Sequence, residues 1–231
     1  MITRRAACCG IAATAWAVLP GRARATECLA FTAERQQALS PAEALERLSR
    51  GNERFLAGAG HDCDLLAQVR ETGAGQAPFA AVLGCMDSRV PPELVLDQRI
   101  GDIFVVRVAG NFVDDDVLGS LEYATAIAGA RAVLVLGHTG CGAVKGAIEG
   151  AELGHLTAML ERLRPAVEAV APAGGDPHDK TLVKAVAEEN VRLCVAAIGR
   201  ESAVMAGLVA QGELLVAGAM HDVETGTVTF M

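Results

Sequence analysis

The stretch Phe79-Ala80-Ala81-Val82-Leu83-Gly84 decides the fold, because six consecutive uncharged residues have the length and character of a buried β-strand. Two further, largely apolar runs of strand length follow at 103–108 and 132–137. The helical patterns that follow the three runs lie at 92–96, 117–128 and 143–148. Continuous apolar strands that alternate with helices predict an α/β fold with a central, mostly parallel β-sheet flanked by helices.

The end of the chain predicts one more parallel strand and a hairpin. A fourth apolar run, 214–217, comes after two long helical stretches at 152–170 and 178–210. Residues 221–231 contain a Glu-Thr-Gly turn and then alternating Thr and Val, which predicts a C-terminal hairpin at the edge of the sheet.

The region before the first strand predicts an N-terminal helical arm. Ser40-Pro41-Ala42-Glu43 is a capping box with proline at the first helical position, and an apolar helical pattern continues from it to Gly58. No internal repeat interrupts the chain, so residues 26–231 are expected to form a single domain with a full hydrophobic core.

Composition excludes several classes of partner. Hydrophobic residues make up 52% of the 231 residues, charged residues make up 21%, and the formal net charge is -8. An acidic chain has no excess of Lys and Arg to meet phosphates, so we expect no nucleic-acid partner. After residue 25 no apolar run reaches 18 residues, so we expect no membrane span in the mature protein.

Residues 1–25 have the layout of a signal peptide. Arg4 and Arg5 are followed by an apolar, uncharged stretch at 6–19, and Ala23-Arg24-Ala25 supplies small residues for cleavage. We therefore expect export, to the periplasm. The arginine pair indicates the twin-arginine route, although the usual apolar residues directly after the pair are missing. An apolar first helix of a cytoplasmic domain is the alternative.

Five of the seven cysteines lie after this leader, and they predict different environments. Free thiols need a reason to stay free in an oxidising compartment, and metal binding by Cys85 and Cys141 would be such a reason. Cys28 and Cys63 lie in polar, loop-like surroundings and could form a disulfide, but sequence cannot show the distance between them. Cys194 lies in an apolar helical pattern, which predicts a buried small hydrophobe.

Two short motifs carry the chemistry of the chain. Cys85-Met86-Asp87-Ser88-Arg89 follows the first strand, and His138-Thr139-Gly140-Cys141-Gly142 follows the third. Ligands of open parallel sheets bind beyond the carboxyl ends of the strands, so the two motifs should share one crevice. Thiolates and imidazoles bind zinc, and three protein ligands leave a fourth position open, as in catalytic zinc sites.

Each residue of these motifs also has an ordinary structural explanation. A cysteine after a core strand is usually a buried hydrophobe, and a histidine there is usually hydrogen-bonded. An Asp-x-Arg pair in a loop is usually a surface ion pair of little energetic weight. The occurrence of five suitable residues at the ends of two apolar strands nevertheless favours a shared metal site over five unrelated structural roles.

The combination Cys-x-Asp-x-Arg and His-x-x-Cys resembles the zinc signature of the β-carbonic anhydrase family. The matching text includes Cys85 to Pro91, 101–104, 107–111 and 137–144, and the resemblance extends over nearly the whole chain after residue 40. It implies reversible hydration of carbon dioxide to bicarbonate and a proton by zinc-bound hydroxide. It also implies one Zn²⁺ per chain.

The resemblance also assigns roles to eight residues. The ligands of the metal would be Cys85, His138 and Cys141. Asp87 would either occupy the fourth metal position in a closed form or pair with Arg89 in an open form. Gln76, Phe104 and Tyr123 match substrate-binding positions of the family. Because the family builds its pocket across a dimer interface, a homodimer or homotetramer is implied.

Other functions stay open at this point. An enzyme that hydrolyses carbonyl sulfide or carbon disulfide could use the same metal site with a different pocket. A non-catalytic zinc or thiol-redox protein would not need Asp87, Arg89 and Gln76. The signatures of a zinc base deaminase are absent from the sequence. No proton shuttle is assigned, and the remaining histidines are interpreted as surface residues: His61, His155, His178 and His221.

Overall fold

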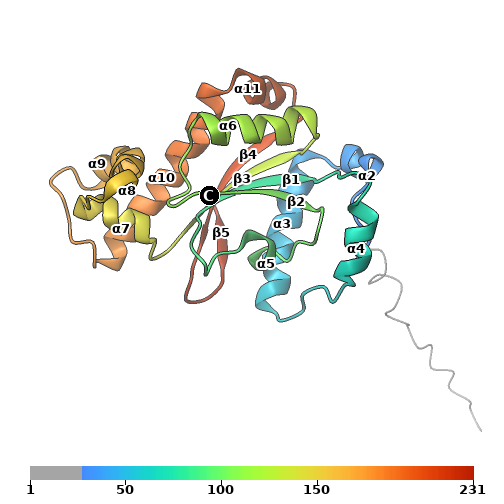
Figure 1. The fold of residues 1–231 in the computed structure, drawn as a ribbon, viewed down its shortest axis with the longest axis horizontal. Helices are drawn as coiled ribbons and strands as arrows, with labels where there is room; N and C mark the ends of the chain where they lie inside the picture. Colours follow the sequence, from blue (N-terminus) through green and yellow to red (C-terminus); the bar gives the residue numbers. More distant parts are fainter. Residues whose placement is uncertain (1–27) are drawn as a thin grey trace, which may run out of the picture.

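The computed structural model describes residues 28–231, so the predicted leader at 1–25 lies outside the described residues. The described chain is an α/β fold around one five-stranded sheet with the order β2-β1-β3-β4-β5 (Figure 1). Its strands are β1 (Ala80–Gly84), β2 (Ile103–Arg107), β3 (Ala132–His138), β4 (Leu215–His221) and β5 (Val228–Phe230). The first four strands are parallel, and β5 runs antiparallel to β4 at the edge. The predicted fold class and the C-terminal hairpin are thus confirmed.

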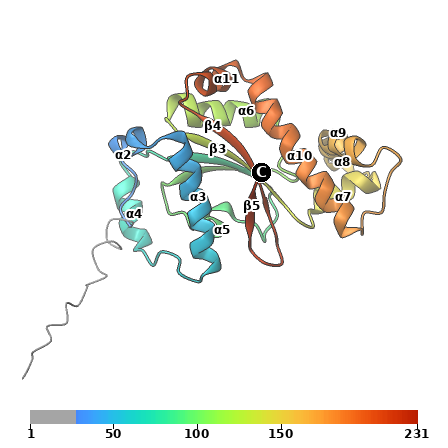
Figure 2. The same cartoon turned by 180° about the vertical axis from the view of Figure 1, so that it is seen from behind.

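Helices cover both faces of this sheet. They are α2 (Ala33–Ala38), α3 (Pro41–Leu56), α4 (Leu65–Thr72), α5 (Pro92–Val95), α6 (Asp115–Glu122), the π-helix η1 (Tyr123–Ile127), α7 (Gly142–Glu149), α8 (Gly154–Leu160), the 3-10 helix η2 (Glu161–Leu163), α9 (Arg164–Val170), α10 (Lys180–Glu201) and α11 (Ala203–Ala210). One core layer packs α6, α7, α9 and α10 against the sheet, and the other packs α3 and α5 against its opposite face (Figure 2).

The register of the central strands positions the two motifs. Strand β1 lies between β2 and β3, and every residue of β1 and β3 is buried, as expected of strands covered on both faces. Gly84 at the end of β1 pairs with Leu136 of β3. Cys85 therefore leaves the sheet at the level of Gly137, one residue before His138, so the motifs meet at one sheet edge.

Three helical stretches that the sequence predicted as continuous are divided or bent in the structure. The predicted helix at 117–128 consists of α6 followed by the π-helix η1, and the stretch at 152–170 is divided among α8, η2 and α9. The stretch at 178–210 bends by 92° between α10 and α11. Ser202 explains that break, because its hydroxyl caps α11 by accepting the amide of Met205.

The N-terminal arm is tied to the body at several points. Helix α3 begins with the predicted capping box, in which Ser40 and Glu43 bond reciprocally. The side chain of Gln36 on α2 donates to the carbonyls of Pro78 and Ala128, both at 2.7 Å. Cys28 and Cys63 form a disulfide, with their Cα atoms 5.5 Å apart, which confirms the pairing left open by the sequence.

Among residues 28–231, no single helix is long and apolar enough to cross a membrane. The pair α10 and α11 meets the length and composition criteria only when the two helices are counted together across their bend.

Candidate metal centre

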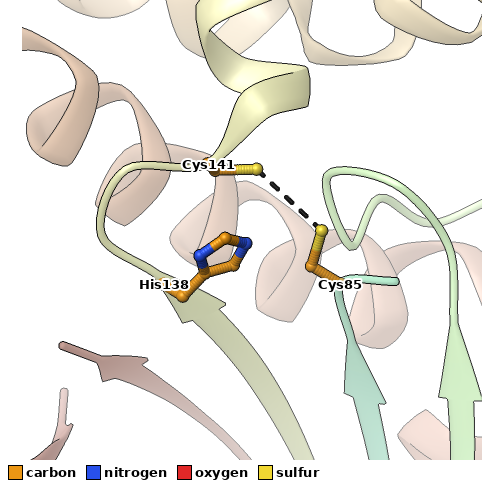
Figure 3. Close-up of side chains that lie close together, drawn as sticks. All are labelled: Cys85, His138 and Cys141. Atoms are coloured by element: carbon orange, nitrogen blue, oxygen red, sulfur yellow. Dashed lines mark hydrogen bonds between the residues drawn. The ribbon is translucent and has the colours of Figure 1, made fainter. Parts of the chain in front are cut away.

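Three residues predicted as metal ligands converge at the carboxyl end of the sheet. Cys85 follows β1, His138 ends β3, and Cys141 caps the start of α7, so that their side chains point toward one another (Figure 3). The potential ligand atoms all lie within 4.8 Å of one another. The exposed fractions of Cys85, His138 and Cys141 are 3%, 0% and 1%. The structure therefore brings together the whole predicted ligand set in a buried cluster.

The turn between His138 and Cys141 is held in shape by the backbone. Gly140 adopts a φ of +64°, a left-handed conformation that favours glycine. The amide of Thr139 donates to the carbonyl of His221 on the neighbouring strand at 2.9 Å. This two-residue turn at Thr139 and Gly140 joins β3 to Cys141, so the imidazole and the thiol lie on the same side of the sheet edge and point toward the cluster (Figure 3).

His138 has a free acceptor aimed into the cluster. Its Nδ1 lies 3.0 Å from the carbonyl of Thr139, and a hydrogen bond there requires the proton on Nδ1 and leaves Nε2 as an acceptor. Nε2 is buried and has no hydrogen-bond partner. An unsatisfied buried acceptor costs about 1–3 kcal/mol, so a ligand that binds this atom would stabilise the site.

The sulfur of Cys85 lies in surroundings that favour the thiolate. It is 4.0 Å from the sulfur of Cys141, and the amide of Gly110 donates to it at 3.3 Å. The hydrogen bond with Cys141 lowers the pKa of Cys85, and the amide of Gly110 acts in the same direction, whereas burial opposes the shift. Thiolates are the form of cysteine that binds metals. Two sulfurs and an unpartnered imidazole nitrogen thus fit a metal ion that accepts soft and borderline ligands.

Asp87 and Arg89 form a fixed pair beside this cluster. The carboxylate of Asp87 accepts from Nε of Arg89 at 3.0 Å and from Nη2 at 2.8 Å, and the same guanidinium reaches the carbonyl of Gly140 at 3.3 Å. These bonds from Arg89 hold the pKa of Asp87 well below its usual range. Oδ2 of Asp87 is 3.9 Å from Nε2 of His138, so an ionised acceptor lies beside the cluster.

Two supporting residues were not identified as functional from the sequence. Arg107, level with Gly84 in the register, donates to the carbonyl of Cys85 at 2.9 Å and to that of Asp87 at 2.6 Å. Asn190 on α10 donates to the carbonyl of Gly110 at 2.9 Å and so holds the amide that contacts Cys85. The sequence signals for Arg107 were its charge at the end of an otherwise apolar strand and its place in the stretch 107–111 that resembles the family.

The predicted substrate-binding residues lie apart from the metal cluster in the same chain. Phe104 and Tyr123 contact each other edge to face, with ring centroids 6.1 Å apart, and line a cavity of about 560 Å³ that none of the three ligand residues lines. Gln76 is exposed and precedes β1, whereas the ligands follow the carboxyl ends of the strands. One chain therefore does not assemble all eight predicted residues.

The burial of the remaining cysteine and histidine side chains can be compared with the predictions from the sequence. Cys194 is buried, and burial raises its pKa to about 12, so it is the unreactive residue that was predicted. His155 and His178 are exposed, as expected. The interpretation of His221 as a surface residue was wrong. Its ring is buried beside His138, and both ring nitrogens are unpartnered in the described structure. His61 is partly buried and lies 2.7 Å from Asp97.

Comparison with known proteins agrees with this geometry. The sequence model of the carbonic anhydrase family matches residues 80–228. Carbonic anhydrase 2 of Mycobacterium tuberculosis is 36% identical over 190 residues, which cover 81% of this chain and 91% of that protein. A carbonic anhydrase of Mycolicibacterium smegmatis is 35% identical over 188 residues, 79% of this chain and 89% of that protein.

Solved structures place the chain in one class of that family. A tetrameric β-carbonic anhydrase of Sordaria macrospora superposes with a TM-score of 0.64 at 26% identity, covering 71% of this chain and 89% of that one. A β-carbonic anhydrase of Aspergillus fumigatus gives 0.65 at 28% identity, covering 72% and 81%. The fold and the buried Cys-His-Cys cluster define a metalloenzyme scaffold. The chain belongs to the β-carbonic anhydrase family of enzymes.

The role of Arg107 as the support of the site is testable. Arg107→Met should weaken metal binding about tenfold, because loss of a supporting contact loosens the loop that carries Cys85. Arg131→Met is a matched control, since Arg131 also donates to two backbone carbonyls, those of Gln37 and Leu39, far from the cluster. Competition with a chromogenic chelator measures the affinity. Equal affinities of the two variants would contradict the role.

Proposed function

We propose that the protein catalyses the reversible hydration of carbon dioxide to bicarbonate and a proton, with one zinc ion per chain. The observation that carries this proposal is the unpartnered Nε2 of His138 between two buried thiols, with the ionised carboxylate of Asp87 3.9 Å away. Family membership supports the same reaction.

The donor set supports zinc as the metal. Cys85, His138 and Cys141 would supply two sulfurs and one nitrogen, and three protein ligands leave a position for a reactant, as in catalytic zinc sites. A bound zinc ion supplies the Lewis acidity that makes water a nucleophile near neutral pH. Thiolate ligands donate electron density to the metal and lower its Lewis acidity. The polar groups beside the metal must therefore contribute more to activating the water.

Asp87 is the residue best placed to orient the attacking water. Its carboxylate stays ionised because Arg89 donates three hydrogen bonds to it, two from the guanidinium and one from the backbone amide, and an ionised carboxylate can only accept. It would therefore accept the hydrogen bond of the water and turn its oxygen toward carbon dioxide. The pairing with Arg89 corresponds to the open arrangement expected from the family, because Oδ2 of Asp87, the oxygen 3.9 Å from Nε2 of His138, accepts a hydrogen bond from Arg89.

The substrate-binding residues are proposed to act across a subunit interface. Phe104, Tyr123 and Gln76 lie away from the metal ligands of their own chain, so a second copy would bring them to its neighbour's site. Within the described residues, β2 is an edge strand with partly exposed apolar residues, and its Phe104 contacts Tyr123 of η1. Ile127 at the end of η1 is 76% exposed. The enzymes of Sordaria macrospora are tetrameric, which supports a homodimer or homotetramer here.

The role of Asp87 is tested by stopped-flow hydration of carbon dioxide, with zinc content measured on the same sample. Asp87→Asn should keep one zinc per chain but lower kcat about a hundredfold, because the amide can donate as well as accept. Asp97→Asn removes another Asp–Arg pair, that with Arg54, and serves as the control.

Two results would contradict this account. Full activity in Asp87→Asn would remove Asp87 from the mechanism. Zinc-loaded wild-type protein without hydration activity would refute the proposed reaction, and carbonyl sulfide and carbon disulfide would then be the next substrates to test.

The proposed interface predicts an effect on association. Ile127→Lys places a charge on the exposed end of η1, the helix whose Tyr123 contacts β2, and should shift the protein toward monomers, with lower activity but unchanged zinc content. Leu153→Lys is the control, because Leu153 is similarly exposed, at 71%, but lies just before α8. Light scattering coupled to gel filtration measures the mass. A monomeric wild type, or an Ile127→Lys protein of unchanged mass, would overturn the interface.

Export is proposed on two grounds. Residues 1–25 have the layout of a signal peptide, and the Cys28–Cys63 disulfide suits an oxidising compartment such as the periplasm. Cell fractionation should recover a periplasmic chain that begins after residue 25, and lysine substitution of Arg4 and Arg5 should block its export. A full-length cytoplasmic chain would contradict export, whereas normal export of the lysine variant would contradict only the twin-arginine route.

A further inference from the structure

A cavity of about 460 Å³ lies against the turn between His138 and Cys141 and collects all the lysines of the chain. The sequence contains three lysines, Lys145, Lys180 and Lys184, and all three line this one cavity. Lys145 comes from α7, whereas the other two stand one turn apart on α10. In a chain with a net charge of -8, this is a local concentration of positive charge.

The lysines are available for a ligand. Lys145 is partly buried, and its ammonium has neither a hydrogen bond nor an ion pair within the described part of the chain. Lys180 pairs with Glu224 at 2.5 Å, and Lys184 pairs with Glu188 at 3.7 Å. The lysine of each pair is exposed to solvent, and ion pairs at exposed sites stabilise a protein little, so an incoming anion can compete for these ammonium groups.

The acidic side chains of the cavity do not neutralise it. Its wall includes four cationic residues, the three lysines and Arg89, but only two acidic ones, Asp222 and Glu224. Oδ1 of Asp222 is already engaged by the amides of Glu224 and Thr225, at 2.8 Å and 3.1 Å. The N-terminal amides of α10 are likewise occupied by the side chain of Asp179. The attraction for a ligand therefore comes from the lysines.

The cavity also adjoins the catalytic centre. Thr139 and Gly140 line it, and both lie in the turn between two proposed metal ligands. Arg89 lines it as well and donates to both Asp87 and the carbonyl of Gly140. A ligand in the cavity would thus be separated from the metal cluster by one layer of residues.

We propose that this cavity binds a small oxyanion and holds the anionic buffer that takes up the proton of the reaction. Hydration of carbon dioxide releases one proton for each bicarbonate, and hydrogen phosphate accepts it to become dihydrogen phosphate. Lysine ammonium groups bind such anions as mobile point charges. The buffering role rests on the proposed function, whereas the binding of the oxyanion does not.

Binding is tested first, with inorganic phosphate as the probe. Calorimetric titration of the zinc-loaded protein should detect phosphate, and Lys145→Ala/Lys184→Ala should weaken its Kd at least about tenfold, because charge-assisted hydrogen bonds are lost. Arg192→Ala/Arg200→Ala is the control, since it removes two exposed cations from α10 outside the cavity. Zinc content and circular dichroism verify that the variants are folded.

The buffering role is tested by turnover. The ratio of phosphate-supported to imidazole-supported turnover should fall about fivefold or more in the lysine variant and stay unchanged in the control. Sulfate, which cannot take up a proton near neutral pH, should compete with phosphate and inhibit the phosphate-supported reaction selectively. Equal inhibition with both buffers would place sulfate at the metal and overturn this role.

The oxyanion site and the buffering role can be contradicted independently of each other. If wild type binds no phosphate, or if the lysine variant and the control bind it equally, the oxyanion site is overturned. If phosphate binds in a lysine-dependent way but the turnover ratio does not change, the buffering role is overturned. Lysine-dependent binding in a protein without hydration activity would contradict the proposed function while supporting the oxyanion site.

Discussion

The parallel pairing of β1 with β3 is the constraint on which the site depends. Both strands are buried along their whole length, and the register that sets Gly84 opposite Leu136 brings Cys85 and His138 to the same edge of the sheet. A slip of one residue would turn every side chain of a strand to the other face, so the burial of the strands also fixes the ligands. The register of the buried β1–β3 pair thus determines both the packing of the core and the geometry of the metal centre.

Burial at this edge controls the chemistry of the side chains that meet there. A thiol, a second thiol and an imidazole acceptor are shielded from water, and His138 keeps one nitrogen without a partner. Such an arrangement is costly unless a ligand completes it. Arg89 and Arg107 act on the same loop in different ways, because Arg89 holds the carboxylate of Asp87 and Arg107 holds the backbone on which Asp87 stands.

The sequence predicted the parts of the structure that depend on local patterns. Apolar runs indicated the strands, and the spacing of Cys85, His138 and Cys141 at strand ends indicated the ligand set, because the carboxyl ends of parallel strands share one edge. It could not predict Asn190, whose hydrogen bond to Gly110 joins residues 80 positions apart. It also misjudged His221, since a histidine within an apolar strand end gives no local signal of its contact with His138.

The positions of Gln76, Phe104 and Tyr123 show the limit of sequence reasoning in another way. Sequence resemblance assigns them to the site, but within one chain they lie apart from the metal cluster. A linear sequence cannot state whether two residues meet within a chain or between chains. The gathering of three lysines on one cavity is equally invisible in the sequence, because Lys145 and the two lysines of α10 are joined only by the packing of α7 beside α10.

X-ray absorption at the zinc edge of the purified protein tests the metal centre most directly. The account predicts one zinc per chain with two sulfur ligands at about 2.3 Å, one imidazole nitrogen at about 2.0 Å and one further light atom. A spectrum without sulfur ligands, or with more than two of them, would contradict the assignment of Cys85, His138 and Cys141 as the ligand set.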